Sequence, residues 1–165
     1  MFLSIILATY NERNNISPLY DKINEAINNK IDFEVIYIDD NSSDGTLDKI
    51  KFLGKNKENI KYISRQHKTG LSSAQLEGAK IASGDLYLFM DSDMQHNPKY
   101  IINMLEVFED KNCNLVSASR FLKKEKINLN KNRYKLSKIV IKLLNFFFKI
   151  KKSDTLTGYF LVHKD

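Results

Sequence analysis

Two aspartates separated by one residue, Asp91 and Asp93, have the type and spacing that most clearly predict chemistry. They follow the apolar run 86–90, so in a continued extended backbone both side chains would point to one side. Carboxylates this close repel one another unless a cation lies between them. Mg²⁺ or Mn²⁺ suits such a pair, because one or two carboxylates commonly hold these ions while substrate phosphates and water complete the shell. The chemistry served would be departure of a nucleoside diphosphate, whose negative charge the ion neutralises. Gln95 offers a further oxygen.

Polar segments also follow two other apolar runs, at 10–12 and 39–46. Ligands of an open α/β sheet bind outside the carboxyl ends of its strands, so we expect all three polar segments to meet there. One of Asp39 and Asp40 is expected to cap a helix or close a turn, which leaves the other available for a ribose or base.

The elements that must position these residues alternate along the chain. Short apolar runs predict strands at 2–7, 33–38, 60–63, 86–90 and 114–119. Amphipathic stretches predict helices at about 14–29, 46–54, 72–83 and 98–109. This alternation predicts an α/β fold with a mostly parallel central sheet flanked by helices. A chain of 165 residues suits one domain, 1–165.

Positive charge is concentrated late in the chain. Residues 1–119 carry 13 Lys and Arg against 17 Asp and Glu, a net charge of −4, whereas residues 120–165 carry 13 against 3, a net charge of +10. Such asymmetry predicts an anionic partner, either nucleic acid or membrane headgroups. The large aromatic residues there lie on an apolar helix face and form no stacking platform, so nucleic acid is not expected.

The stretch 134–151 within this basic segment is predicted to form an amphipathic helix. Its polar residues recur at helical spacing on one narrow stripe: Lys135, Lys138, Lys142, Asn145 and Lys149. An interfacial membrane helix fits this pattern. A core helix whose lysines extend to solvent is the alternative.

Other features indicate a cytoplasmic protein that is peripheral on the cytoplasmic face of a membrane. Cys113 is the single cysteine, so no intramolecular disulfide is expected. The apolar start of the chain, 1–7, lacks a basic leader and predicts a strand rather than a signal peptide. No stretch approaches the roughly 20 apolar residues of a transmembrane helix.

Several segments resemble, in order, the motifs of the family 2 glycosyltransferases. They are Ala8-Thr9-Tyr10-Asn11-Glu12, Ile38-Asp39-Asp40, Ser43-Asp44-Gly45-Thr46, Gly70-Leu71, Gly84-Asp85, Met90 to His96, Ser119-Arg120-Phe121 and Thr157-Gly158-Tyr159-Phe160. Within this family the likeness is strongest to dolichol-phosphate mannosyltransferases and related polyprenyl-phosphate sugar transferases. The resemblance implies the GT-A fold, a Rossmann-like nucleotide-diphospho-sugar transferase fold.

The resemblance also implies roles for matching positions. Residues that would bind the nucleotide sugar are Ala8, Tyr10, Glu12, Ile38, Asp40 and Ser92. The implied metal ligands are Asp91, Asp93 and Gln95. The acceptor phosphate would be received by Arg120, Arg133 and Ser137, and the implied catalytic residues are Asp91, Asp93 and Arg120.

The reaction this implies is inverting transfer of a hexose, expected to be mannose from GDP-mannose, to dolichyl or polyprenyl phosphate. Arg120 and Arg133 support a phosphate acceptor on their own chemistry, because the guanidinium group suits bidentate phosphate recognition. An anionic acceptor needs no general base. The three histidines, His67, His96 and His163, are accordingly expected to be surface or loop residues.

Alternatives remain open at this stage. Another nucleotide sugar, a glycan acceptor, or a truncated module that binds nucleotide sugar without turnover would also fit. An Asp-x-Asp phosphatase would normally carry its pair after the first strand, and a dinucleotide oxidoreductase needs glycines there; this chain has Ala8-Thr9-Tyr10. Family members continue beyond the Gly-aromatic motif, so the chain is expected to be C-terminally short, and a separate membrane subunit is a further expected partner.

Overall fold

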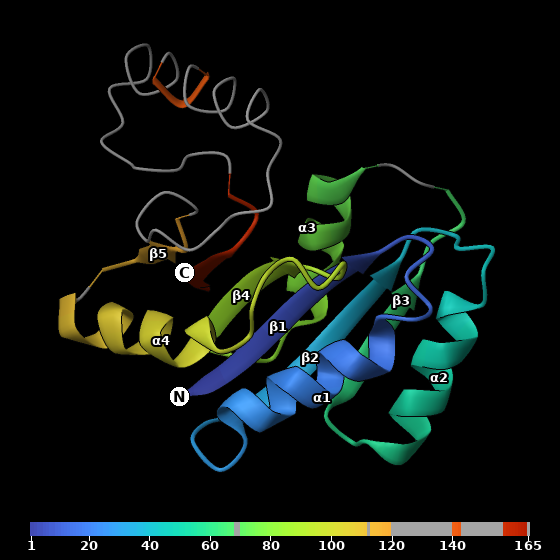
Figure 1. Ribbon diagram of the computed structural model, residues 1–165, viewed down its shortest axis with the longest axis horizontal. Helices are drawn as coiled ribbons and strands as arrows, with labels where there is room; N and C mark the ends of the chain where they lie inside the picture. The colour runs from blue at the N-terminus through green and yellow to red at the C-terminus, as the bar shows by residue number, and fades with distance from the viewer. Residues whose placement is uncertain (68–69, 112, 120–139, 143–156, 165) are drawn as a thin grey trace.

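The computed structural model describes residues 1–67, 70–111, 113–119, 140–142 and 157–164, in which helices flank a six-stranded sheet (Figure 1). The strands are β1 (Phe2–Thr9), β2 (Asp32–Asp39), β3 (Ile60–Ser64), β4 (Leu86–Asp91), β5 (Leu115–Ser117) and β6 (Phe160–His163). The helices are α1 (Ile16–Ile27), α2 (Thr46–Asn56), α3 (Leu71–Ile81) and α4 (Tyr100–Lys111).

The sheet is mostly parallel, as predicted, with strand order β3-β2-β1-β4-β6-β5. Strands β1 to β4 pair in parallel, and β6 runs antiparallel to both β4 and β5. Five of these six strands therefore point the same way. The predicted strands and helices are confirmed with small shifts of their ends, but β6 was not predicted. It is a four-residue run, and such a short apolar segment carries little periodicity to identify it.

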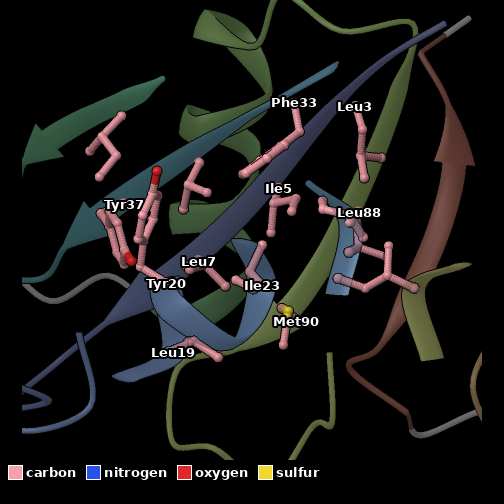
Figure 2. Close-up of a cluster of buried hydrophobic side chains, with 14 of the residues drawn as sticks. Leu3, Ile5, Leu7, Leu19, Tyr20, Ile23, Phe33, Tyr37, Leu88 and Met90 are labelled. Atoms are coloured by element: carbon pink, nitrogen blue, oxygen red, sulfur yellow. The ribbon is translucent and has the colours of Figure 1, made fainter. Parts of the chain in front are cut away.

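Both faces of the sheet are covered by helices, which explains why β1 and β2 are apolar along nearly their whole length. Helices α1, α2 and α4 pack with Leu3, Ile5 and Leu7 of β1 on one face (Figure 2). The alternate residue Ile6 faces the opposite side, where Ala74 of α3 packs against it. The sheet is thus fixed from both sides, and its strand ends provide a rigid base for the loops beyond them.

A buried polar network joins β2 to the turn before β4 at the amino ends of the strands. Glu34 is 3% exposed, and its Oε1 accepts hydrogen bonds from Ser4 Oγ at 2.7 Å and from Ser83 N at 2.6 Å. Lys61 Nζ lies 2.7 Å from Oε2. Burial raises the pKa of Glu34, but the hydrogen bonds from Lys61, Ser4 and Ser83 outweigh it, so this pKa lies below its ordinary value.

Replacing Glu34 with Gln is expected to lower the free energy of unfolding at neutral pH by about 1 to 3 kcal/mol, because the Lys61 ion pair and the charged acceptor are lost. The native carboxylate has a lowered pKa, so its contribution is complete above about pH 4.5 and is lost as the pH falls through the folded-state pKa. The deficit of the variant should therefore shrink in acid. Urea unfolding at pH 7 and at about pH 3.5 measures this. Glu58→Gln, at an exposed position, is the control and should show no deficit at pH 7.

Gly84 lies so close to β1 that no side chain fits there. An added Cβ would come within 2.7 Å of the Phe2 carbonyl oxygen and 2.8 Å of Ser4 N, and these backbone atoms cannot move independently of β1. Gly84→Ala is expected to destabilise the protein by about 3 kcal/mol. The matched change Gly54→Ala, in helix α2, places its Cβ at an ordinary 3.6 Å from Ile60 Cγ2 and should stabilise by about 0.5 to 1 kcal/mol. Thermal unfolding of both variants tests the contrast.

Candidate functional site

The carboxyl ends of β1, β2 and β4 lie side by side in the sheet. Their register pairs Ala8 with Asp91 and Thr9 with Asp39. The polar segments that follow these strands therefore meet at one edge, as the sequence predicted. Among parallel α/β sheets this edge is where ligands bind.

The loops after β1 and β2 are bound to each other by hydrogen bonds. Asn11 N donates to Ser42 Oγ at 2.8 Å, and Asn11 Oδ1 accepts from Ser43 N at 2.9 Å. Glu12 N donates to Thr46 Oγ1 at 2.8 Å. Asn11 has a φ of 58°, a left-handed conformation that asparagine tolerates better than most residues. The two loops thus form one bonded unit above the strand ends.

The residues expected to bind the nucleotide sugar differ in how accessible they are. Tyr10 is 45% exposed, and Glu12 is half-buried with its carboxylate accepting a hydrogen bond from Asn15 Nδ2. Ser92 is buried, and its Oγ donates to the Ala8 carbonyl at 2.8 Å, which ties the loop after β4 to β1. Ile38 is fully buried in the core under α3, so its side chain serves packing.

Asp39, the last residue of β2, and Asp40, the residue after it, have different partners. Asp39 closes a turn: its Oδ1 accepts from Ser42 Oγ at 2.6 Å and its Oδ2 from Ser42 N at 3.1 Å. Asp40 is 5% exposed and forms an ion pair with Arg65. The expected helix cap is wrong for both, because Asp44 Oδ1 instead accepts from the Thr46 amide at the start of α2. The turn role falls to Asp39, whose carboxylate bonds Ser42 within the loop that precedes α2.

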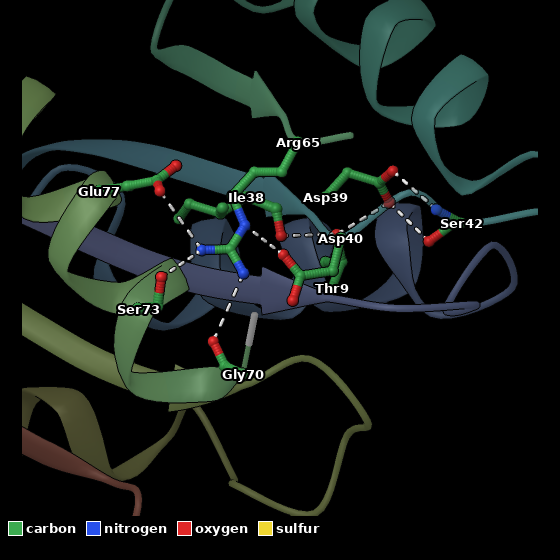
Figure 3. A network of polar contacts seen from close by, with 9 residues as sticks. All are labelled: Thr9, Ile38, Asp39, Asp40, Ser42, Arg65, Gly70, Ser73 and Glu77. Atoms are coloured by element: carbon green, nitrogen blue, oxygen red, sulfur yellow. Dashed lines mark hydrogen bonds and ion pairs between the residues drawn. The ribbon is translucent and has the colours of Figure 1, made fainter. Parts of the chain in front are cut away.

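Arg65, just after β3, is one site residue that the sequence analysis did not identify. Its Nε lies 2.5 Å from Asp40 Oδ1, and its Nη1 donates to Ser73 Oγ at 2.9 Å (Figure 3). Glu77 Oε1 lies 3.5 Å from the same Nη1. A cationic partner stabilises a buried carboxylate, and arginine is scarce in this chain, so an arginine at the end of a predicted strand was the signal that the sequence offered.

The aspartate pair lies at the end of β4. Asp91 is the last residue of the strand, with its side chain 38% exposed. The strand ends there and Met94 has a φ of 66°, so the extended backbone does not continue through Asp93. Asp93 Oδ1 instead accepts from Gln95 N at 3.0 Å, which closes a local turn in the loop after β4. Gln95 itself is exposed.

His96 lies in a loop, as predicted, but it packs beside the Asp91 carboxylate. Its Nδ1 accepts from Asp91 N at 2.9 Å, and its Nε2 lies 3.5 Å from Asp91 Oδ2. The imidazole ring stacks on Tyr159, with ring centroids 5.0 Å apart, and its side chain is only 15% exposed. Burial also raises the pKa of the Tyr159 hydroxyl, whose oxygen donates to the Asn97 carbonyl.

Gly158, just before β6, keeps space open in front of Asp91. A Cβ at this position would lie 3.3 Å from Asp91 Oδ1 and 3.5 Å from Oδ2. Both carboxylate oxygens therefore face space that any larger residue would fill. Within the described ranges no three His, Cys, Asp or Glu side chains form a group that could hold a metal ion. The side chains present fit Mg²⁺ or Mn²⁺, because two carboxylates and an amide offer hard oxygen atoms, and the diphosphate of a donor would supply further ones.

The acceptor-phosphate residues Arg120, Arg133 and Ser137 lie outside the described residues, and so does the proposed helix 134–151 apart from 140–142. These roles stay predictions. Across the part of the chain that is described, no helix combines the length and apolar character needed to cross a membrane.

Comparison with known proteins places this geometry in a family. The family model described as Glycosyl transferase family 2 matches residues 4–165. A curated relative named dolichol-phosphate mannosyltransferase, from Pyrococcus furiosus, is 34% identical over 168 residues, which cover 100% of this chain and 47% of the relative. The chain thus spans about half the length of that relative.

Solved structures show the same fold at lower identity. Mannosyl-3-phosphoglycerate synthase from Rubrobacter xylanophilus superposes with a TM-score of 0.76 at 20% identity, over 99% of this chain and 53% of that one. A mannosyltransferase from Pyrobaculum calidifontis, solved in complex with GDP-Man and Mn²⁺, has a TM-score of 0.63 at 22% identity, over 72% of this chain and 35% of that one. The predicted GT-A fold is confirmed. The family match along nearly the whole sequence shows that this chain belongs to glycosyltransferase family 2.

Proposed function

We propose that this domain transfers a hexose, mannose from GDP-mannose, to a dolichyl or polyprenyl phosphate with inversion. The observation that carries the proposal is the Asp91 and Asp93 pair at the end of β4, at the sheet edge where the loops after β1 and β2 also lie. The Pyrococcus furiosus relative's name supports this acceptor, and the Pyrobaculum calidifontis complex supports this donor and Mn²⁺.

The donor would lie across the carboxyl ends of β1, β2 and β4. Asp91, Asp93 and Gln95 would hold the divalent ion. When bound, this ion would neutralise the negative charge that develops on the departing diphosphate. The loops after β1 and β2, which are hydrogen-bonded to each other, would bind the nucleoside. Tyr10 and Asp40 would be among its contacts. Because these loops are already bonded to one another, little ordering is required when the donor binds.

The acceptor would approach from the basic part of the chain. Arg120, Arg133 and Ser137 would align the lipid phosphate for attack on the anomeric carbon, and this attack needs no general base because the phosphate is already anionic. The net charge of +10 over residues 120–165 would favour an anionic membrane surface. We place the reaction on the cytoplasmic face of a membrane, with the helix 134–151 at the interface and a separate membrane subunit as a further proposed partner.

Sugar transfer to polyprenyl phosphate tests the proposal. The purified chain would be incubated in detergent with Mn²⁺, radiolabelled GDP-mannose and a polyprenyl phosphate, and lipid-linked sugar would be extracted and counted. Formation of β-linked mannosyl lipid is the expected result. Parallel reactions would use UDP-glucose as the donor or a glycan as the acceptor. Product formation in one of these instead would indicate another family 2 activity. Calorimetric binding of GDP-mannose with no transfer to any acceptor would contradict the proposal and favour a binding module.

A further inference from the structure

His96 faces Asp91 with both of its ring nitrogens. The Asp91 amide donates to Nδ1 at 2.9 Å, and Nε2 lies 3.5 Å from Asp91 Oδ2. A ring nitrogen that accepts a hydrogen bond carries no proton, so the single N–H of this neutral imidazole is on Nε2. The ring N–H is therefore on the nitrogen that lies beside the Asp91 carboxylate.

The position of the His96 ring is fixed by the segment that leads into β6. The imidazole stacks on Tyr159, with ring centroids 5.0 Å apart and the two planes 18° from parallel. Tyr159 is 3% exposed, and its hydroxyl donates to the Asn97 carbonyl at 3.2 Å. Met94, whose φ is 66°, packs against the same core from within the loop between Asp91 and His96. The ring and the loop that carries it are thus both anchored in the core.

These contacts distinguish the two carboxylate oxygens of Asp91. Oδ2 lies beside the N–H of His96, whereas no residue in the described ranges donates a hydrogen bond to Oδ1. The space kept open by Gly158 borders Oδ1 and the His96 ring, since a Cβ there would lie 3.3 Å from Oδ1 and 3.6 Å from His96 Cε1. The Nε2 to Oδ2 distance exceeds that of an ordinary hydrogen bond, and such contacts often shorten when a ligand binds. Oδ1 is the oxygen left available to that ligand.

We infer that His96 is a positioning residue for the divalent ion: its Nε2–H holds Oδ2 of Asp91 and so presents Oδ1 to the ion, while Tyr159 keeps the ring in place. A carboxylate that binds a metal ion is commonly hydrogen-bonded by a neighbouring group, and losing that group typically lowers metal affinity or activity by about ten- to a hundredfold. The inference rests on the proposed function, because it takes Asp91 as a ligand of the ion. In a purely structural role, closing the loop through Nδ1 would be the whole contribution of His96.

The test separates the two ring nitrogens. The amide of His96→Asn reaches about as far as Nδ1 and can accept from the Asp91 amide, but it places nothing at Nε2. The amide of His96→Gln reaches about as far as Nε2 and can donate to Oδ2. His96→Ala lacks both contacts. Binding of Mn²⁺ to the full chain, with saturating GDP or UDP, would be measured by calorimetry and by electron paramagnetic resonance of the unbound ion. Urea unfolding would measure the stability of each variant.

Metal affinity and stability should change in different orders. His96→Ala and His96→Asn should weaken Mn²⁺ binding by about ten- to a hundredfold, whereas His96→Gln should stay within about threefold of the unchanged protein. His96→Asn should nevertheless be more stable than His96→Gln, because only asparagine preserves the hydrogen bond that closes the loop.

Two further changes test the support of the ring. Tyr159→Leu should weaken Mn²⁺ binding more than Tyr159→Phe, which keeps an aromatic ring for His96 to stack on. His163→Asn is the matched control, because it makes the same chemical change in β6 where this strand pairs with the start of β4, at Leu86. It should leave Mn²⁺ binding unchanged.

Three results would overturn the inference: Mn²⁺ affinity that falls in the same order as stability, full affinity in His96→Ala, or no Mn²⁺ binding by the unchanged protein with either nucleotide. Asp91→Asn would be measured alongside. If it lost Mn²⁺ binding while every His96 variant kept it, the proposed ion site would stand and the role of His96 alone would fail. These measurements involve no acceptor and no turnover, so a failed transfer assay would not decide them.

Discussion

Asp91→Asn is expected to reduce sugar transfer by about a thousandfold. The change keeps the shape of the side chain but removes a charge that would hold the divalent ion against the donor diphosphate. Loss of a preorganised charge at a departing group typically costs about two to three orders of magnitude in rate. Asp93→Asn should behave similarly, and turnover with GDP-mannose and a polyprenyl phosphate measures both.

Metal dependence gives this prediction a second readout. EDTA should abolish transfer by the unchanged protein, and added Mn²⁺ or Mg²⁺ should restore it. Calorimetric titration of Mn²⁺ in the presence of GDP should show weaker binding to both aspartate variants. Asp110→Asn, at an exposed position on α4, is the matched control and should retain full activity. Full activity of Asp91→Asn and Asp93→Asn would show that the ion is held elsewhere.

Gly158→Ala is expected to lower transfer by about ten- to a hundredfold while leaving stability nearly unchanged. The added methyl would lie 3.3 Å from Asp91 Oδ1 and 3.5 Å from Oδ2, so the carboxylate must shift, and the space for an ion in front of it shrinks. A displacement of this size at a reacting centre is costly because catalysis depends on close positioning. The apparent affinity for Mn²⁺ should fall together with kcat.

Gly54→Ala makes the same chemical change in α2, where its Cβ meets only Ile60 at ordinary distance. It should keep full transfer activity, so the pair of variants separates crowding of the site from the general effect of an added methyl. If Gly158→Ala retained the metal affinity and rate of the unchanged protein, the space in front of Asp91 would not be the ion's position.

Local patterns in the sequence were sufficient to predict most of the strands and helices. They also predicted that the pair Asp91 and Asp93 lies at the end of a strand. Apolar runs identified β1, β2 and β4 because these strands are buried along most of their length, and shorter apolar runs identified β3 and β5. Strand β6 escaped because its pairing with β4 joins Phe89 to Phe160, a contact that no local pattern encodes. The same distance in sequence hid Gly158, whose importance depends on which carboxylate it faces.

The partners of Asp40 and Asp91 were hidden for a related reason. Arg65 is 25 residues from Asp40, and only the parallel pairing of β2 with β3 brings them together. His96 is five residues from Asp91, yet its orientation depends on the left-handed turn at Met94 and on stacking against Tyr159. The sequence could name the residue types required at this edge, but not which of them would contact one another.

The position of β6 between β4 and β5 has a consequence for how the domain matures during synthesis. Strands β1 to β4 can pair as soon as residue 91 is available, because they are each other's neighbours. Among the described strands β5 pairs with β6 alone, so this pairing must wait until residues 160–163 are made. Gly158 arrives with that same segment, and Tyr159, on which His96 stacks, arrives beside it. A nascent chain would therefore expose its aspartates well before their surroundings are complete, and the competence to bind an ion would appear late, in one step with closure of the sheet.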